Sequence, residues 1–190
     1  MHEDFIMVGR DLATSGAVTS HGGNMSRREG DAVLITRTGS MLGHLTEDDI
    51  METSFSACGD PRDGRCSVEL VVHRAIYDAT DAFAIVHAHT AHTIVRSLVA
   101  DAIVPLDSES LLRLGEVPVV SHPDTIGSPE AGAIIAAALR EHPIVVLRGH
   151  GPFAAGATLE EAFQYVSCLE ASCRILDWLD ATGRDVIPVE

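Results

Sequence analysis

Apolar residues along the chain follow two alternating patterns, one with helical spacing and one of short continuous runs. Residues 67–80 place apolar side chains three and four positions apart, which predicts a helix. Similar spacing predicts further helices over residues 3–15, 91–100, 128–142 and 158–182. Apolar runs rich in β-branched residues predict buried strands at residues 32–40, 82–90, 117–120 and 143–151. The alternation predicts a sheet covered by helices on both faces.

Local signals mark the ends of several of these helices. Gly16 follows the first helix and is expected to end it. Ser67 is a candidate N-cap for the helix over residues 67–80, and Ser128 precedes a proline, which is typical of a helix start. Thr158 and Glu161 have the spacing of a capping box. A similar pattern at residues 46–49 predicts a helical turn over residues 45–51.

Composition indicates one ordinary α/β domain over residues 1–190, with 46% hydrophobic but only 4% aromatic residues. No apolar run approaches the roughly 20 residues of a membrane span, and the acidic N-terminus lacks the order of a signal peptide. A cytoplasmic protein is therefore expected. The net charge of −15 argues against nucleic acid and anionic membrane surfaces as partners, since both attract basic proteins.

The cysteine and lysine content of the chain limits the types of reaction that it could catalyse. The four cysteines form no C-x-x-C pair and are interpreted as reduced thiols: Cys58, Cys66, Cys168 and Cys173. The chain contains no lysine, because all 13 basic residues are arginine. Schiff-base, pyridoxal-phosphate and Walker-type phosphate chemistry all need a lysine and are excluded. Carbanion chemistry in this chain would need another electron sink, for which a metal ion is suited.

Histidines stand at the ends of two predicted strands. His87 and His89 are two residues apart, so on a strand they project from one face. Either a pair of core histidines with polar partners or two ligands of one metal ion fits this segment. His150 lies between two glycines and, taken alone, fits an ordinary turn. Glu69 falls in the first turn of a predicted helix, where capping alone explains a carboxylate. Together the four residues form a plausible catalytic divalent-metal set.

Two glycine-rich loops are candidate anion sites. The segments "HGGN" (21–24) and "TRTGS" (36–40) combine exposed backbone N–H groups with small polar side chains. Either segment also fits an ordinary turn. Four arginines are candidate sources of local positive charge near them, although each also fits an ordinary solvent-facing position: Arg27, Arg28, Arg37 and Arg148.

Taken in order, these motifs resemble the class II aldolase/adducin-head family. The matching strings are "SHGGNMS", "ITRTGSMLGHLTEDDI", "SVELVVHRAIYDAT", "AIVHAHTAHT" and "LRGHGPFAAGATLEEAF", and the resemblance covers roughly residues 3–180. It implies a three-layer α/β/α sandwich around a mixed, largely antiparallel sheet. It also implies a homotetramer with active sites between neighbouring subunits.

The resemblance assigns roles to particular residues. His87, His89 and His150 match the zinc-ligating histidines of the family, and Glu69 matches the glutamate that is both general base and metal ligand. Four residues match positions around the substrate phosphate: Asn24, Thr38, Gly39 and Ser67. Manganese or cobalt are alternatives to zinc.

The activity that the resemblance implies is that of a metal-dependent aldehyde-lyase. Such an enzyme cleaves a small ketose phosphate, such as L-fuculose 1-phosphate, into dihydroxyacetone phosphate and an aldehyde through a metal-stabilised enediolate. Two alternatives stay open. One is a sister reaction of the family, namely sugar-phosphate epimerisation, dehydration or decarboxylation. The other is a non-catalytic binding module like the adducin head.

Two departures from the family pattern bear on this choice. The family often has a second serine where this chain has Val68, so one hydroxyl contact to phosphate is missing. Fuculose-phosphate aldolases use a tyrosine from a neighbouring subunit as an acid, and the corresponding segment "VPLDSES" (104–110) contains none. Asp107, Ser108 and Glu109 are candidates for this acid, which can also come from elsewhere.

Overall fold

The computed structural model describes residues 2–56 and 60–184. The prediction of a reduced thiol at Cys58 lies outside the described residues, whereas Cys66, Cys168 and Cys173 are free and buried. Within these ranges eight strands form one sheet: β1 (Asn24–Glu29), β2 (Ala32–Thr36), β3 (Ile50–Ser54), β4 (Ala84–His87), β5 (Ala102–Ile103), β6 (Val117–Val120), β7 (Ile144–Leu147) and β8 (Gly151–Gly156).

The strands follow the order β3-β2-β1-β4-β8-β7-β6-β5 across the sheet. Neighbouring strands are antiparallel except β6 and β7, which are parallel. The predicted mixed, largely antiparallel sheet is therefore confirmed. The described residues also form six α-helices and three short 3₁₀ segments: α1 (Glu3–Thr14), α2 (Leu70–Ala79), α3 (Ala91–Ser97), α4 (Ser108–Leu114), α5 (Pro129–Ala138), α6 (Leu159–Thr182), η1 (Leu42–His44), η2 (Glu47–Asp49) and η3 (Pro61–Arg65).

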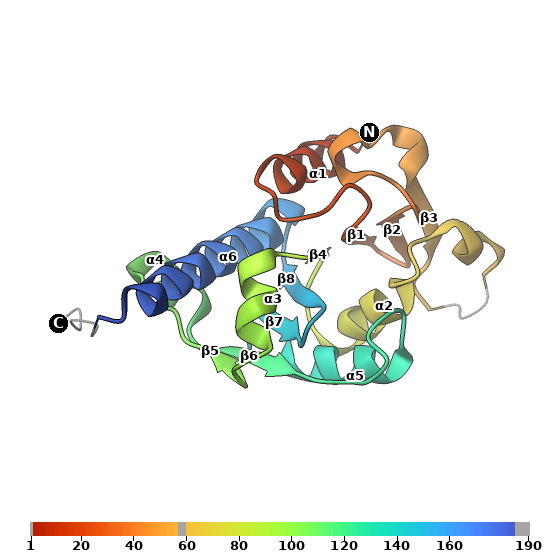
Figure 1. The fold of residues 1–190 in the computed structure, drawn as a ribbon. Coiled ribbons are helices and arrows are strands. Elements are labelled where there is room, and N and C mark those ends of the chain that lie inside the picture. Colours follow the sequence, from red (N-terminus) through yellow and green to blue (C-terminus); the bar gives the residue numbers. More distant parts are fainter. Residues whose placement is uncertain (1, 57–59, 185–190) are drawn as a thin grey trace.

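Two hydrophobic layers pack on opposite faces of the sheet. Helices α1 and α6 cover one face, and α2 and α5 lie side by side against the other (Figure 1). Successive strand residues point to opposite faces, so Ile85 contributes to the layer under α2 and α5, whereas Val86 contributes to the layer under α1 and α6. Strand β7 divides in the same way, with Val145 on the first side and Val146 on the second. The apolar runs are continuous because both faces are buried.

The predicted helix ends are largely confirmed. Ser128 and Thr158 accept hydrogen bonds from backbone N–H groups in the first turns of α5 and α6. Gly16 follows α1 with a φ of 76°, a conformation that glycine adopts without strain. The N-cap predicted at Ser67 is wrong: α2 begins at Leu70, because residues 67–70 form a tight turn before the helix. No helix within the described ranges is both long and apolar enough to cross a membrane.

Several elements differ from the sequence prediction. The segment expected to form a helical turn over residues 45–51 contains the predicted capping box but forms only η2, after which the chain enters β3. The strand predicted over residues 143–151 ends at Leu147, turns back through three residues and continues as β8. The short elements β5 and α4 have no counterpart in the sequence prediction.

Candidate metal centre and substrate cavity

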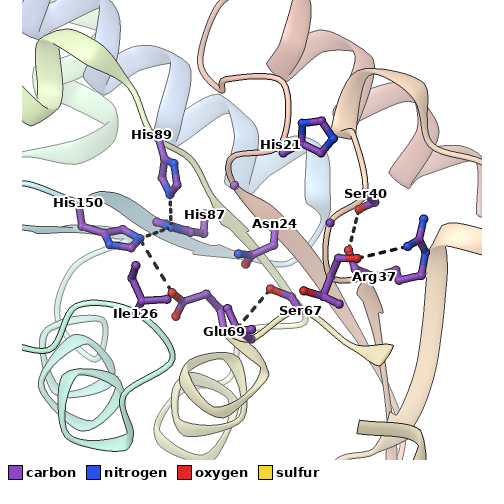
Figure 2. A pocket seen from close by; sticks show the side chains of 14 residues that line it. His21, Asn24, Arg37, Ser40, Ser67, Glu69, His87, His89, Ile126 and His150 are labelled. Atoms are coloured by element: carbon purple, nitrogen blue, oxygen red, sulfur yellow. Dashed lines mark hydrogen bonds and ion pairs between the residues drawn. The ribbon is translucent and has the colours of Figure 1, made fainter. Parts of the chain in front are cut away.

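Three histidine side chains converge at one edge of the central strands (Figure 2). His87 is the last residue of β4, and His150 lies in the turn between β7 and β8. His89 lies two residues beyond the end of β4, so it is not on the strand as predicted. The Nε2 atom of His87 is nevertheless 2.9 Å from that of His150 and 3.0 Å from that of His89.

The loop carrying His89 reaches this position because two glycines let the backbones approach. Gly149 has a φ of 71° in the turn that carries His150. A Cβ atom on Gly151 would lie only 2.2 Å from the carbonyl oxygen of Ala88. Any larger residue at Gly151 would therefore push the loop containing His89 away from the other two histidines.

The His87 ring is held in the orientation that a metal ligand needs. Its Nδ1–H donates to the carbonyl oxygen of Pro152 at 2.9 Å, which leaves the lone pair of a neutral ring on Nε2. The ring also stacks on Phe153 with centroids 3.9 Å apart. Burial lowers the pKa of His87 well below its usual range. Burial, and to a smaller extent the nearby His89, lowers the pKa of His150 to about 4. The rings are therefore neutral near pH 7.

Glu69 completes the group from the opposite wall. Only 3% of the residue is exposed, and its Oε1 lies 3.9 Å from Nε2 of His150. The N–H of Gly127 donates to Oε1 at 3.2 Å, whereas the buried Oε2 has no hydrogen-bond partner among the described residues. Burial raises the pKa of Glu69 to about 7, despite the Gly127 bond.

This donor set fits a divalent metal ion. Each of the three imidazole rings has a nitrogen within 4.8 Å of a nitrogen of the others, next to an unpaired carboxylate oxygen, and a divalent cation binds donors arranged in this way. Two nitrogens bound tetrahedrally to zinc at about 2.0–2.1 Å would lie about 3.3 Å apart, within a few tenths of an ångström of the two His87 distances. The chain can therefore hold a metal with His87, His89 and His150, and with Glu69 as a further ligand.

A cavity extends from the histidines toward the loop after β2 (Figure 2). It brings together all eight residues predicted to bind metal or substrate: Asn24, Thr38, Gly39, Ser67, Glu69, His87, His89 and His150. Strand pairing places Asn24 directly opposite His87, because β1 and β4 are antiparallel neighbours. The remaining lining residues are His21, Gly23, Arg37, Ser40, Val68 and Ile126.

The end of the cavity away from the histidines is suited to an anion. The turn after β2 exposes the backbone of Gly39, which has a φ of 71°. The N–H groups of Thr38 and Ser40 donate to backbone oxygens, whereas that of Gly39 has no acceptor within the described part of the chain. The hydroxyl of Ser67 accepts a hydrogen bond from the N–H of Glu69 and still has a proton to donate.

The predicted arginines contribute little charge to this cavity. Only Arg37 lines it, and its guanidinium pairs with Asp49 at 2.7 Å. Arg27 pairs with Asp4 and Glu29, Arg28 stacks over Phe55, and Arg148 pairs with Asp101. The expectation of positive charge from Arg27, Arg28 and Arg148 at this site is therefore wrong.

The candidate acids of the segment 104–110 lie away from the cavity of their own chain. Asp107 caps α4, where its Oδ1 accepts from the N–H of Ser110 at 2.9 Å. Ser108 and Glu109 belong to the same short helix, which packs against α6.

Two site residues were not predicted from the sequence. They are Ile126, which lines the cavity, and Gly127, whose N–H bonds Glu69. An apolar residue and a glycine before a helix N-cap carry no chemical signal of their own.

Comparison with known proteins agrees with this geometry. The family model described as "Class II Aldolase and Adducin N-terminal domain" matches residues 3–176. The chain belongs to the class II aldolase and adducin family. The L-fuculose phosphate aldolase of Methanocaldococcus jannaschii is 32% identical over 177 residues, which cover 91% of this chain and 93% of that protein. The methylthioribulose-1-phosphate dehydratase of Gluconacetobacter diazotrophicus is 31% identical and covers 88% of each.

A solved structure confirms the fold class. The crystal structure of L-fuculose-1-phosphate aldolase from Thermus thermophilus superposes with a TM-score of 0.92 at 35% identity, covering 98% of this chain and 97% of that one. Class II aldolases are metal-dependent, and the three-histidine group of this chain is able to bind a metal. The relatives include both an aldolase and a dehydratase, so family membership alone leaves the reaction open.

Proposed function

We propose that this protein, as one domain over residues 1–190, is a metal-dependent aldolase acting on a small ketose phosphate. The substrate class is that of L-fuculose 1-phosphate, and the products are dihydroxyacetone phosphate and an aldehyde. The observation that carries the proposal is Glu69, which places a buried, unpaired carboxylate oxygen beside three converging imidazole nitrogens. A general base and a metal site thus share one end of a cavity whose other end is suited to phosphate.

His87, His89, His150 and Glu69 would hold the ion, with zinc as the proposed metal and manganese or cobalt as alternatives. When bound, the ion supplies Lewis-acid polarisation of the substrate carbonyl and stabilises the negative charge that develops as the carbon–carbon bond breaks. Neutral histidines suit this role, because only the unprotonated nitrogen has a lone pair to give.

Glu69 is the proposed proton-transfer group. Its pKa of about 7 lies near neutral pH, where a carboxylate both accepts and releases a proton readily. The Gly127 N–H fixes one carboxylate oxygen and leaves the other free for the substrate or the metal. A φ of 59° and a Cβ that would lie 2.8 Å from the carbonyl oxygen of Val68 make glycine necessary at Gly127.

Asn24, Thr38, Gly39 and Ser67 are the proposed contacts of the substrate phosphate. Backbone N–H and hydroxyl groups bind a phosphate without any lysine, which agrees with the composition of the chain. The phosphate end then lies across the cavity from the histidines, so the carbonyl end of a short ketose phosphate reaches Glu69.

A dehydratase, epimerase or decarboxylase is the second candidate. It is supported by Val68 at the cavity wall, by the absence of tyrosine in residues 104–110, and by the similarity to a methylthioribulose-1-phosphate dehydratase. The adducin-like binding module is a weaker alternative, because a module without catalysis has no need for the combination of Glu69 with three histidines.

Product analysis with a panel of ketose and pentulose phosphates separates these candidates. We expect triose phosphate and a free aldehyde from the wild-type protein, and a loss of at least about 10²-fold in Glu69→Gln. Glu141→Gln, at an exposed position beyond α5, is the matched control and should retain full activity. Dehydrated, epimerised or decarboxylated products would replace the aldolase proposal by the second candidate. Undiminished cleavage by Glu69→Gln would refute its role as base.

We also propose that the protein is a homotetramer with sites at subunit interfaces. Large apolar side chains are exposed on and beside α3 and α4, including Leu98 at 61%, Val99 at 76% and Leu112 at 85%. Such a concentration is typical of a surface that another subunit covers. Light scattering on the purified protein should give four times the chain mass of 20.2 kDa, and a monomeric mass would contradict the proposal.

A further inference from the structure

A chain of buried hydrogen bonds lies behind Asn24. His73, in α2, is fully buried, and both of its ring nitrogens are engaged. Its Nε2 is 2.6 Å from Oδ1 of Asn24, and its Nδ1 is 2.6 Å from Oγ of Ser26. Ser26 in turn lies 2.8 Å from the hydroxyl of Tyr77. The four side chains therefore connect the interior of the molecule to a residue that lines the cavity.

The protons of this chain can run in only two directions. Each hydroxyl has one proton, and a neutral imidazole has one N–H and one lone pair. In the first direction Tyr77 donates to Ser26, and Ser26 donates to Nδ1 of His73. The proton of the His73 ring then lies on Nε2 and is donated to the amide oxygen of Asn24. In the reverse direction Nδ1 of His73 donates to Ser26 and Nε2 carries the lone pair, so the amide nitrogen of Asn24 would have to face it.

The geometry favours the first direction. The 2.8 Å distance between the hydroxyls of Tyr77 and Ser26 fits an O–H···O bond donated by either of them, so the direction depends on where the remaining protons find acceptors. In the reverse direction the Tyr77 proton would have only the carbonyl oxygen of Phe83, at 3.5 Å. A charged His73 would have to be stabilised without any carboxylate bonded to its ring, at a site with no exposure to water.

We propose that His73 is a positioning residue, which holds the Asn24 amide so that its NH₂ group faces the cavity as a donor. The inference rests on the proposed function, in which Asn24 contacts the substrate phosphate. Phosphate oxygens accept hydrogen bonds, so an NH₂ group attracts them, whereas the amide oxygen would repel them. In Figure 2 Asn24 lies between His87 and Ser67, where its amide would contact a ligand that spans the cavity.

The first test is spectroscopic and is independent of catalysis. Nitrogen-15 NMR of histidine-labelled protein, with the His73 signal assigned by its loss in His73→Gln, should show a protonated Nε2 and an unprotonated Nδ1. The opposite tautomer, or a mobile average of the two, would overturn the inference. This readout does not depend on whether the protein is an aldolase.

The second test uses two variants that each keep one half of the imidazole. His73→Gln places an amide nitrogen near the position of Nε2 and can still donate to Asn24. His73→Asn reaches only to the position of Nδ1 and keeps the Ser26 contact alone. The readout is the dissociation constant for inorganic phosphate, measured calorimetrically at matched metal content. We expect about tenfold weaker binding in His73→Asn and a change within about twofold in His73→Gln.

A double-mutant cycle with Asn24→Ala decides whether His73 acts through Asn24. If it does, His73→Asn adds nothing to the loss already caused by Asn24→Ala. Additive losses would show a general effect on folding and would overturn the inference. Weak phosphate binding in Asn24→Ala, with His73→Asn unaffected, would overturn the inference while leaving the proposed phosphate site intact. Unchanged binding in Asn24→Ala would refute the phosphate role of Asn24 and this inference together.

Discussion

Removing the Glu69 carboxylate should stabilise the metal-free protein at alkaline pH while abolishing its proposed activity. The carboxylate is buried, and one of its oxygens has no partner in the described structure. Its ionised form is therefore costly to the fold until a cation binds. Glu69→Gln keeps the shape of the side chain and the acceptor for Gly127, but removes the titration.

The size of the effect follows from the pKa of Glu69, which burial raises from 4.5 to about 7. The folded state then binds this proton more tightly than the unfolded state does. The stability that this bound proton contributes is fully present below pH 4.5 and is lost as the pH rises through the folded-state pKa of about 7. At about 1.4 kcal/mol per pH unit, the complete loss is about 3 kcal/mol. Most of it, about 2–3 kcal/mol, falls between pH 5 and pH 8.

The assay is urea unfolding of wild type and Glu69→Gln in excess chelator at pH 5 and pH 8. From pH 5 to pH 8 the unfolding free energy of the wild type should fall by about 2–3 kcal/mol more than that of the variant. The exposed control Glu141→Gln should follow the wild type. Parallel pH dependence of Glu69→Gln and wild type would refute the argument that this carboxylate is desolvated and unpaired. Added zinc should stabilise the wild type more than the variant.

Three further predictions test separate parts of the structure. His89→Ala should keep its fold by circular dichroism but bind much less than one zinc per chain by elemental analysis, because it removes one of three converging nitrogens. Thr158→Ala should lose about 1 kcal/mol of unfolding free energy without losing zinc, because its hydroxyl caps α6, and Thr158→Ser should recover most of it. Burial raises the pKa of Cys66 to about 11 and of Cys173 to about 12, so mass spectrometry should find both thiols unlabelled by maleimide at pH 7 until urea unfolds the protein.

The layered fold could be predicted from sequence because its strands and helices have distinct periodicities. Runs such as residues 144–147 are apolar at every position, since both faces of their strands are covered. Strand β8 was missed because "GPFAAG" contains no β-branched residue and begins with glycine and proline. Pro152 is unusual in a central strand, yet its carbonyl oxygen fixes the His87 ring. Strand propensity therefore fails to predict β8, because the site requires Pro152, a residue that is unfavourable in a central strand.

The sequence indicated which residues form the candidate site, but it did not indicate how the backbone brings them together. His89 was expected on the same strand as His87, but the strand ends at His87, and tertiary packing at Gly151 places the His89 loop. His73 follows Glu69 by one helical turn in the sequence, but its full burial against Asn24 could be found only in the structure. His73 lies in α2 and Asn24 in β1, so their contact depends on how the helix packs against the sheet, which the local sequence pattern does not encode.

The proposal that this protein is a metal-dependent aldolase is tested by measuring chelator-sensitive release of dihydroxyacetone phosphate. Zinc-loaded wild-type protein is incubated with L-fuculose 1-phosphate and related ketose phosphates, with and without chelator, and the triose phosphate is measured enzymatically after the chelator has been removed. We expect release that stops with chelator and returns when zinc is restored. No release from protein that demonstrably holds zinc would contradict the aldolase assignment and favour a sister reaction at the same site.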